Sequence, residues 1–525
     1  MQTNSTQAIN SIVVIGGGSA GWITAGLLAS EHVSGDAGGV SVTLIESPDV
    51  KTIGVGEGTW PTMRTTLQKI GISETEFLRE CSGSFKQGTK FVGWTTGDEG
   101  DTYYHPFSAP VGYSSVNLVP YWQEQRDRVS FVDAVSTQGH ICDKYLAPKQ
   151  DATPEYAHVA NYAYHLDAGK FASLLQRHCT TKLGVRHVVD HVTGINGAPD
   201  EDIRSVSTKQ TGEIDGDLFI DCTGFASLLL GKHYGIGYLD KQHILFNDSA
   251  LAIQVPYADK SGAIASQTIS TAQNAGWIWD IGLTERRGIG YTYSSRHTSD
   301  SDAETVLKKY IEQTSGVAVD PFEPRKLSFR PGHRQKFWHR NCVAVGMSAG
   351  FLEPLEASAL VLVELAGRMI SEELPANRGV MDIVAKRYND RFLYRWDRII
   401  DFLKLHYVLS QRSDSDYWID NRREESIPDN LQELLELWRY HVPGHKDFSQ
   451  VEEIFSAASY QYVLYGMGFE TQERAGSQHA NDAEKARRLF AENNKKTQQV
   501  VANLPGNREL LTHIGQHGLP GRENL

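Results

Sequence analysis

The clearest chemical motif lies near the N-terminus, where three glycines have the spacing Gly16-x-Gly18-x-x-Gly21 between an apolar stretch and a helical one. Gly16 permits a tight turn, Gly18 lets the backbone approach a pyrophosphate, and Gly21 lets helix and strand pack closely. A helix N-terminus adds free N–H groups and a partial positive charge. Glu46 ends the next apolar stretch, where an acid can accept from a ribose hydroxyl. The pattern predicts a dinucleotide site; the alternative is a glycine-rich turn without a ligand.

The rest of the chain favours FAD over a nicotinamide dinucleotide. Two later apolar stretches, 217–221 and 342–345, also run into glycines, at Gly224 and Gly346. They indicate a sheet that the chain revisits, with an extended cofactor lying across its strand ends. We find no second Gly-x-Gly-x-x-Gly unit for a nicotinamide, so electrons for a reduced flavin are expected to come from elsewhere.

Three other positions carry side chains suited to oxidative chemistry. Lys86 has apolar neighbours, and its ammonium can donate a hydrogen bond while its neutral amine can act as a nucleophile. Trp277 and Trp279 are separated by one residue, so a strand would place both indoles on one side. A solvated lysine and two core tryptophans are the alternatives at these positions.

These segments together resemble the flavin-dependent tryptophan halogenases. Residues 276–282 are similar to the family signature W-x-W-x-I-P, with Gly282 in place of the proline, and residues 351–360 resemble F-V-E-P-L-E-S-T-G-I. Ser84-Phe85-Lys86 matches the segment that carries the family's lysine. Weaker matches extend the resemblance to about residue 410, at residues 54–59, 104–107, 161–165 and 246–249.

The resemblance implies a role for each matched residue. Lys86 points into a tunnel between flavin and substrate, and Glu356 orients the halogenating species or takes the proton from the arenium intermediate. The backbone N–H groups of Ser358 and Ala359 bind halide. The other implied roles are substrate sandwiching by His105 and Phe107, flavin shielding by Trp277 and Trp279, and FAD binding by Gly16, Gly18, Ser19, Ala20, Gly21, Glu46, Gly56, Glu57, Val192, Gly224, Gly346, Met347 and Leu360.

The activity that the resemblance implies is halogenation by an FADH2-dependent oxidoreductase. Oxygen and chloride or bromide would yield hypohalous acid, which would substitute an electron-rich aromatic. A separate NAD(P)H flavin reductase is expected to supply the reduced flavin. An FAD-dependent aromatic monooxygenase and a catalytically degenerate flavin-binding protein are the alternative hypotheses.

One part of the family pattern is missing, and it bears on the substrate. Members that act on free tryptophan carry a Phe-Trp pair and an Asn upstream of a Tyr-rich helix, whereas residues 455–460 here lack them. The groups that would hold an ammonium and a carboxylate are therefore not matched. An indole without the amino-acid backbone is the expected substrate.

Composition limits the other possibilities. The chain has 525 residues, is 40% hydrophobic and 22% charged, and has a formal net charge of −13. This balance argues against a nucleic-acid or anionic-membrane partner. The 5 cysteines are scattered without metal-ligand spacing, so we expect no metal site and a reduced, cytoplasmic compartment. No apolar stretch is long enough for a membrane span. A homodimer is a further expectation.

The elements that must position these residues form a discontinuous α/β fold. Residues 11–15, the helix from Trp22 to about Ser30 and residues 40–45 predict a βαβ unit opening a doubly wound Rossmann-like sheet. Aromatic, alternating segments at about 85–165 and 240–335 predict an inserted, mostly antiparallel substrate region. We therefore expect a discontinuous FAD-binding module over 1–380. Helical spacing from about 380, and again over 481–503, predicts a mainly helical substrate-covering region over 381–525.

Overall fold

The computed structural model describes residues 7–33, 39–50, 56–316, 323–450, 452–472 and 482–521. The chain divides into two compact units. The first consists of Met1–Ser82, Leu166–Lys241 and Arg330–Trp396, and the second of Gly83–His165, Gln242–Phe329 and Asp397–Leu525. Each unit is therefore built from three separate stretches of sequence. The expected division at residue 380 stays a prediction.

The first unit contains a six-stranded sheet with the order β20-β21-β12-β1-β2-β8 among the described residues. Strands β21, β12, β1, β2 and β8 pair in parallel, and β20 is antiparallel at the edge. The chain returns twice to the first strand's neighbourhood, which confirms the predicted revisited sheet. The strands are β1 (Ser11–Ile15), β2 (Ser41–Glu46), β8 (Arg186–Val189), β12 (Leu218–Asp221), β20 (Trp338–His339) and β21 (Cys342–Ala344).

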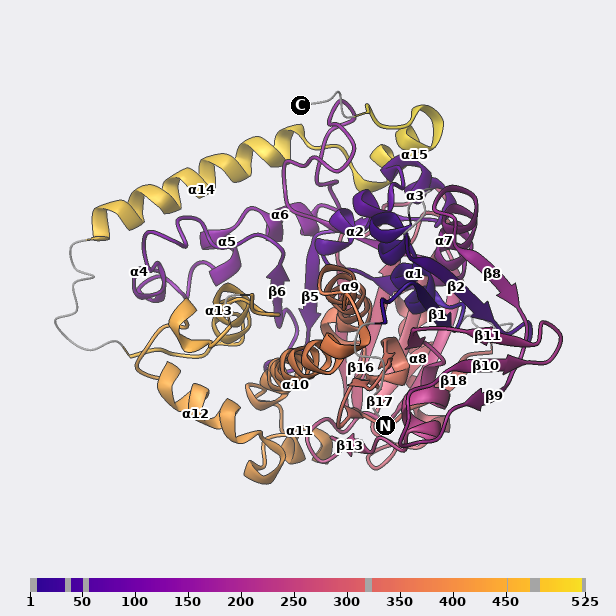
Figure 1. The fold of residues 1–525 in the computed structure, drawn as a ribbon. Coiled ribbons are helices and arrows are strands. Elements are labelled where there is room, and N and C mark those ends of the chain that lie inside the picture. Colours follow the sequence, from indigo (N-terminus) through magenta and orange to yellow (C-terminus); the bar gives the residue numbers. More distant parts are fainter. Residues whose placement is uncertain are drawn as a thin grey trace. The chain divides into compact units, whose positions relative to one another are not determined.

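Helices pack against this sheet and against one another in the first unit (Figure 1). Helix α1 is buried from Gly21 to Ala29, because it contacts α2, α7 and α9 as well as β1 and β2. It is accordingly apolar nearly all round, as a fully buried helix must be. These helices are α1 (Ser19–His32), α2 (Thr62–Ile70), α3 (Glu74–Glu80), α7 (Ala168–Lys182) and α9 (Ser358–Glu372).

Smaller elements complete the first unit. Strands β9, β10 and β11 form one three-stranded sheet, and β13, β19 and β22 form another. Their bounds are β9 (Val192–Asn196), β10 (Ser205–Thr208), β11 (Glu213–Asp215), β13 (Tyr238–Asp240), β19 (Gly332–Arg334) and β22 (Gly350–Phe351). The short elements are β3 (Glu57–Gly58), η1 (Gly224–Ala226), η2 (Leu228–His233), η3 (Gly346–Ser348) and η4 (Leu355–Ala357).

The second unit is organised around a seven-stranded sheet, described in the order β18-β14-β17-β16-β15-β5-β6. All its pairings are antiparallel except that of β15 with β5, so the mostly antiparallel prediction is confirmed. The strands are β5 (Gly88–Val92), β6 (Thr102–Pro106), β14 (Ser249–Pro256), β15 (Thr268–Gln273), β16 (Gly276–Gly282), β17 (Arg286–Tyr293) and β18 (Arg325–Ser328). Strands β4 (Ser84–Lys86) and β7 (Ala163–Leu166) pair separately.

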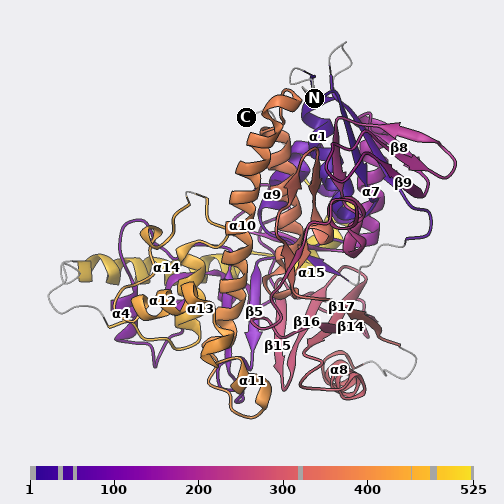
Figure 2. The same ribbon diagram turned by 60° about the horizontal axis from the view of Figure 1, so that its bottom comes forward.

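Helix α8 (Asp300–Ser315) lies beside β14 and β17 of this sheet (Figure 2). Leu307 and Ile311 pack there with sheet residues such as Ile278. The sequence did not predict this helix, nor α4 (Val119–Gln123), α5 (Phe131–Val135) and α6 (Gln138–Asp143). Local caps specify several of them: the Ser299 side chain accepts from Asp302 N–H, and Ser130 from Asp133 N–H. A single Ser without a long apolar period is a weak signal, which explains the omission.

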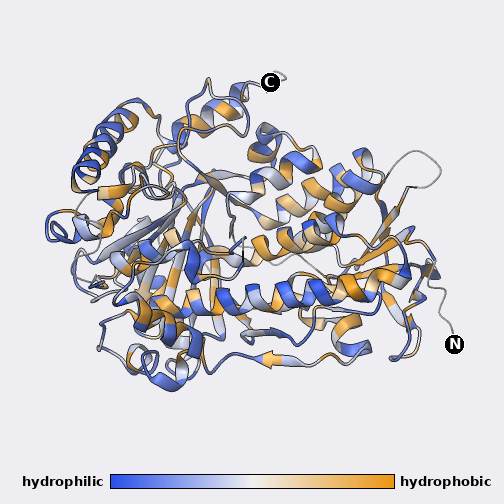
Figure 3. Ribbon diagram, turned by 60° about the vertical axis from the view of Figure 1, so that its left-hand side comes forward, coloured by the Kyte–Doolittle hydropathy of each residue, from blue (hydrophilic) through white to orange (hydrophobic). Residues whose placement is uncertain are grey.

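The C-terminal part is helical, as predicted. Helix α10 (Arg378–Val408) buries the predicted face that includes Phe392, Trp396 and Tyr407. Figure 3 shows that apolar and polar residues alternate along the helices, as expected where one face is buried and the other is exposed. The remaining elements are α11 (Asp416–Asp420), η5 (Glu424–Ser426), α12 (Asp429–Trp438), η6 (His445–Asp447), α13 (Ala457–Gly466), α14 (Ala483–Asn503) and α15 (Asn507–His517). Asn481, the predicted start of α14, lies outside the described residues.

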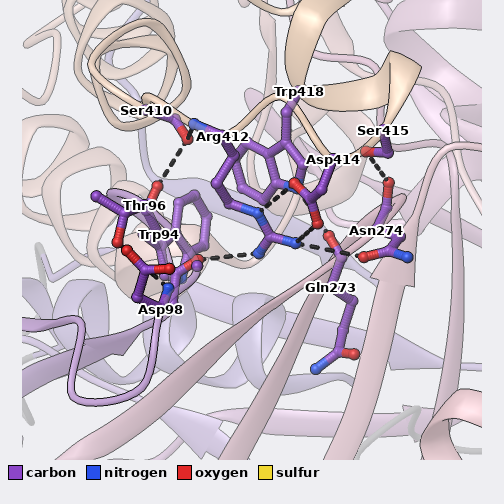
Figure 4. A network of polar contacts seen from close by, with 12 residues as sticks. Trp94, Thr96, Asp98, Gln273, Asn274, Ser410, Arg412, Asp414, Ser415 and Trp418 are labelled. Carbon is purple, nitrogen blue, oxygen red and sulfur yellow. Dashed lines mark hydrogen bonds and ion pairs between the residues drawn. The ribbon is translucent and has the colours of Figure 1, made fainter.

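A buried arginine joins the segment after α10 to the sheet of the second unit (Figure 4). Arg412 donates to the Asp414 carboxylate at 2.6 and 3.0 Å and to the Gly93 carbonyl at 2.9 Å, and its guanidinium lies 4.8 Å from the Trp418 ring centre. Gly93 directly follows β5. These bonds tie the chain after α10 to the β5–β6 connection, and β6 carries His105.

Among the described residues, no helix is both long and apolar enough to cross a membrane.

Candidate functional site

The predicted dinucleotide motif lies where β1 meets α1. Gly16 has φ +120°, and a Cβ there would come within 2.2 Å of the Cys222 carbonyl oxygen. A Cβ on Gly21 would come within 1.9 Å of the Gly16 oxygen, so only glycine allows this close packing. A Cβ on Gly18 would meet nothing within 4 Å. Gly18 is also the N-cap of α1, and a glycine has no side chain that could cap the first N–H groups of the helix. Open space before a helix N-terminus fits the pyrophosphate of FAD.

The carboxyl ends of β12 and β21 also lie beside the glycine-rich turn between β1 and α1. Gly346 has φ +72°, and a Cβ there would lie 2.8 Å from the Ala20 Cβ, so this strand end touches the start of α1. The Met347 Cε atom lies 3.7 Å from the ideal Cβ position of Gly224. The carboxyl ends of parallel strands are where doubly wound sheets bind ligands. The structure thus brings Gly16, Ala20, Gly224, Gly346 and Met347 together.

Glu46 is held by partners that the sequence did not reveal. Its carboxylate contacts the His187 Nε2 atom at 3.0 Å. A Cβ on Gly17 would lie 2.2 Å from the Glu46 carboxyl carbon, so the middle glycine leaves room for this side chain. Asp190 N–H donates to the Glu46 carbonyl oxygen at 2.9 Å, and Val192 begins β9 two residues later. Val192 therefore belongs to the same neighbourhood as Glu46. His187 and Gly17 were missed because neither fits a motif.

Glu356 lies in a constrained turn that precedes α9. Glu356 and Ala357 both have positive φ, 63° and 56°, an uncommon conformation for residues other than glycine. The Trp60 indole N–H donates to the Glu356 carbonyl oxygen at 2.7 Å. Because the Trp60 hydrogen bond holds this turn, the backbone position from which the Glu356 side chain extends is fixed. Trp60 was not predicted; the nearby Gly56 and Glu57 were, whereas Gly54 and Val55 of that motif lie outside the described residues.

The predicted halide ligands form the first turn of α9. Ser358 is the first helical residue, and Ala359 and Leu360 follow. The N–H groups of a first turn have no partner within the helix, and the helix dipole adds positive charge there. A halide could bind at this position through main-chain donors. Ala359 replaces the family's glycine here, and helical geometry accommodates that change.

Two carboxyl groups of the first unit have raised pKa values. Burial raises the pKa of Glu57 to about 7. Burial also raises the pKa of Glu364 in α9 to about 7, although hydrogen bonds from Thr66 and Thr62 of α2 oppose the rise. The Thr66 hydroxyl donates to Glu364 at 2.5 Å. Glu364 thereby links α2 to the helix that begins at the predicted halide ligands.

Lys86 is buried in the second unit. It ends β4 and is only 1% exposed, which excludes the solvated-lysine alternative. Its ammonium lies 5.4 Å from the ring centre of Phe107, so the structure brings these two predicted site residues together. His165 is paired with Ser84 on the neighbouring strand β7. Burial, and then the nearby charge of Lys86, holds the pKa of His165 well below its usual range. Lys86 therefore has a neutral imidazole nearby.

His105 lies among aromatic rings of the second unit. Its ring centre is 5.5 Å from that of Phe402 and 6.4 Å from that of Phe455. Phe402 and Phe455 are themselves stacked, with centres 3.8 Å apart. The family match alone indicated His105; Phe402 and Phe455 were missed as its neighbours because they come from distant parts of the chain.

Trp277 and Trp279 point to the same side of β16, as predicted. Their ring centres are 6.2 Å apart in an edge-to-face arrangement. Trp279 fills the space above Gly290 of β17, where a Cβ would lie 2.1 Å from its ring. Trp277 lies beside Trp94, with ring centres 6.2 Å apart. The core-packing alternative is therefore realised at both positions, and flavin shielding stays a prediction.

Comparisons with known proteins identify the family. The tryptophan halogenase family matches residues 11–483 of the chain. Tryptophan 7-halogenase RebH of Lentzea aerocolonigenes is 33% identical over 490 residues, covering 88% of this chain and 90% of the relative. The chain belongs to the tryptophan halogenase family.

Solved halogenase structures agree with this assignment. A tryptophan halogenase from Shewanella frigidimarina is 52% identical, has a TM-score of 0.96 and covers 99% of this chain and 100% of that one. BrvH, a flavin-dependent halogenase from Brevundimonas sp. BAL3, is 30% identical with a TM-score of 0.84, covering 96% of this chain and 99% of that one. The halogenase described here is thus a flavin-dependent enzyme that uses FAD and halide to modify an aromatic substrate. The monooxygenase and non-enzymatic alternatives are not favoured.

Proposed function

We propose that this halogenase transfers halogen to an indole that lacks the free amino-acid backbone, with Lys86 and Glu356 as its catalytic residues. The observation that carries the proposal is the buried Lys86 ammonium, 5.4 Å from the Phe107 ring centre. A desolvated ammonium beside an aromatic ring is suited to present an electrophile to a second ring placed there.

The chain's own residues have distinct proposed tasks. The glycines at the ends of β1, β12 and β21 hold FAD, which in its reduced form supplies the electrons that convert oxygen and halide into hypohalous acid. The first-turn N–H groups of α9, at Ser358 and Ala359, hold the halide. Lys86 donates a hydrogen bond to the hypohalous acid and polarises its halogen. Glu356 accepts the proton that the ring carbon loses, so the net products are a halogenated ring and water.

The proposed substrate class follows from the residues around His105. RebH and the protein from Shewanella frigidimarina are tryptophan halogenases, but Phe455 here is 2% exposed and stacked on Phe402. The described neighbours of His105 are aromatic rings, whereas an ammonium and a carboxylate require charged partners. We propose that His105 and Phe107 hold the indole ring, and that Trp277 and Trp279 keep it apart from the flavin.

Three further features complete the proposal. A separate NAD(P)H flavin reductase supplies FADH2, because the chain has a single dinucleotide motif. The halogenase is cytoplasmic, in keeping with its five unpaired cysteines Cys81, Cys142, Cys179, Cys222 and Cys342. A homodimer stays a prediction.

The test is incubation of the protein with a flavin reductase, NADH, FAD and either bromide or chloride. The aromatic panel contains indole, 3-methylindole, tryptophan and a tryptophan-containing peptide, and products are identified by mass spectrometry. We expect a halide-dependent product with the mass of a halogenated indole. Hydroxylated products that form without halide would support a monooxygenase instead, and no product from any panel member would contradict the proposal.

A further inference from the structure

Three amide side chains of the second unit contact the segments that carry Lys86 and Phe107. Gln87 follows Lys86 directly, Gln138 begins α6, and Asn161 precedes β7. Gln87 and Gln138 are both completely buried. We call these residues the amide triad. None of the three was predicted to have a catalytic or binding role.

Gln138 is the centre of the amide triad. Its Oε1 atom accepts from the Ser108 backbone N–H at 2.7 Å, and its Nε2 group donates to the Asn161 carbonyl oxygen at 2.6 Å. The same Nε2 group is 3.5 Å from the Gln87 Oε1 atom. One buried side chain thus contacts the Ser108 backbone after Phe107, the Gln87 side chain after Lys86 and the Asn161 backbone.

The other two amides bind the same segments directly. The Asn161 side chain donates to the Phe107 carbonyl oxygen at 2.9 Å. The Phe107 backbone N–H donates to the Gln87 carbonyl oxygen at 3.3 Å. Gln87 is anchored in turn, because its side-chain Nε2 group donates to the Leu146 carbonyl oxygen at 2.8 Å. The Phe107 carbonyl is therefore bound by the Asn161 side chain, and the Phe107 N–H group by the Gln87 backbone carbonyl.

The arrangement has a mechanical consequence. Buried, satisfied hydrogen-bond networks are rigid, because leaving any member unpaired in a low-dielectric interior is costly. Side chains of the amide triad bond to the Phe107 carbonyl oxygen and to the Ser108 N–H group, and the Gln87 backbone, next to Lys86, accepts from the Phe107 N–H group. These bonds thus link the backbone position of Phe107 to that of the residue after Lys86.

We propose that the amide triad determines which ring carbon is halogenated, by fixing the Phe107 platform relative to Lys86. This inference rests on the proposed function, in which Phe107 holds the substrate ring and Lys86 presents the halogen. A misplacement of about 1 Å can cost roughly 10²-fold in rate, and neighbouring ring carbons are separated by little more than that. A small shift of Phe107 therefore exchanges one reacting carbon for another. The members of the amide triad are positioning residues.

The experiment compares two substitutions of Gln138. Gln138→Leu removes both hydrogen-bonding atoms. Gln138→Glu keeps the acceptor for Ser108, but it can donate to the Asn161 carbonyl only while its carboxyl group is protonated, a state that burial favours. Gln432→Leu is the matched control, since Gln432 of α12 also donates from a partly buried amide to a carbonyl, that of Ile427 at 2.9 Å. Melting temperature and FAD affinity establish that each variant is folded.

The readout is the ratio of regioisomers formed from indole and from 3-methylindole, whose most reactive carbon is blocked, at pH 6 and pH 8. We expect Gln138→Leu to change this ratio about tenfold at both pH values. Gln138→Glu should approach the wild-type ratio at pH 6 and depart from it at pH 8, whereas wild type and Gln432→Leu should give the same ratio at both.

Each outcome decides the proposal. A folded Gln138→Leu variant with the wild-type ratio overturns it. If Gln138→Leu does not fold, Gln138→Glu decides, and a wild-type ratio at pH 8 overturns it. Absence of any halogenated product from the wild-type enzyme would instead overturn the proposed function, and this inference with it.

Discussion

At the scale of single residues, the two proposed catalytic side chains have different surroundings. Lys86 is buried beside an aromatic ring and a neutral histidine, so its ammonium is largely desolvated. Glu356 is held by a left-handed backbone turn and by the Trp60 indole. The first position provides electrostatic stabilisation, and the second provides a fixed carboxylate.

We expect Lys86→Ala to abolish halogenation while FAD still binds, because the substitution removes the group that presents the halogen and leaves the dinucleotide site intact. Product formation is measured with a flavin reductase present, and FAD affinity is measured by fluorescence titration. Lys90→Ala is the control, since Lys90 is four residues further on and pairs with Asp143 at 2.8 Å. Wild-type halogenation by Lys86→Ala would show that the buried lysine is structural.

We expect Glu356→Gln to lower kcat by about 10²–10⁴-fold, the usual contribution of a positioned acid or base. Glutamine has nearly the same shape, so the turn and its bond from Trp60 should persist, and the melting temperature should change little. Steady-state turnover with a saturating indole is the measurement. A decrease smaller than about threefold would leave Glu356 with a structural role only.

At the scale of elements, helix ends and strand ends determine where ligands can bind. The N–H groups in the first turn of α9 have no partner within the helix, and the Glu364 side chain in the same helix binds α2 through two threonine hydroxyls. The β5–β6 connection is anchored by Arg412, and β6 carries His105. Catalytic residues on short segments are thus supported by longer packed elements.

The α2–α9 contact predicts a pH-dependent stability. The pKa of Glu364 is about 7 in the folded protein, above its usual value of 4.5. The folded protein therefore holds this proton more tightly than the unfolded chain, and its stabilising effect is lost as pH rises from about 4.5 through 7. We expect Glu364→Gln, which cannot ionise, to gain stability relative to wild type across this range, by up to about 3 kcal/mol. Calorimetric melting at pH 5.5 and pH 8 measures the difference, and an equal difference at both values would contradict the prediction.

At the scale of the whole molecule, each unit is assembled from three stretches of the chain. The dinucleotide site belongs to the first unit and the aromatic site to the second. Sequence changes near residues 455–460 can therefore alter the choice of substrate without changing the dinucleotide site. Relatives named for tryptophan need not share their substrate with this chain.

We expect indole, or a larger indole-bearing molecule, to be halogenated with higher kcat/KM than free tryptophan. Among the described residues, the rings of Phe402 and Phe455 lie beside His105, and the family's groups for an ammonium and a carboxylate are not matched in residues 455–460. A site without such partners gains nothing from a substrate's charges and must desolvate them. Competition between indole and tryptophan in one reaction measures the ratio directly. A tenfold preference for tryptophan would mean that other residues bind its charged groups.

The sequence by itself determined the parts that depend on local pattern. The glycine spacing at residues 16–21 and the returning stretches at 217–221 and 342–345 predicted the dinucleotide fold, and close backbone approach permits only glycine at Gly16 and Gly21. The family motifs named Lys86, Glu356, His105 and Phe107, whose roles stay predictions. Helical periodicity also predicted α10, whose apolar face is long and regular.

Tertiary structure alone decided which distant residues meet. His187 against Glu46, Trp60 against Glu356, Phe402 and Phe455 beside His105, and Gln138 between Gln87 and Asn161 are each contacts between separate chain segments. Such side chains have no sequence signature, because a single amide or ring acquires its role only when folding removes water and supplies its partner. For the same reason, a solvated Lys86 stayed an alternative in the sequence, and its burial in the folded protein excluded that alternative.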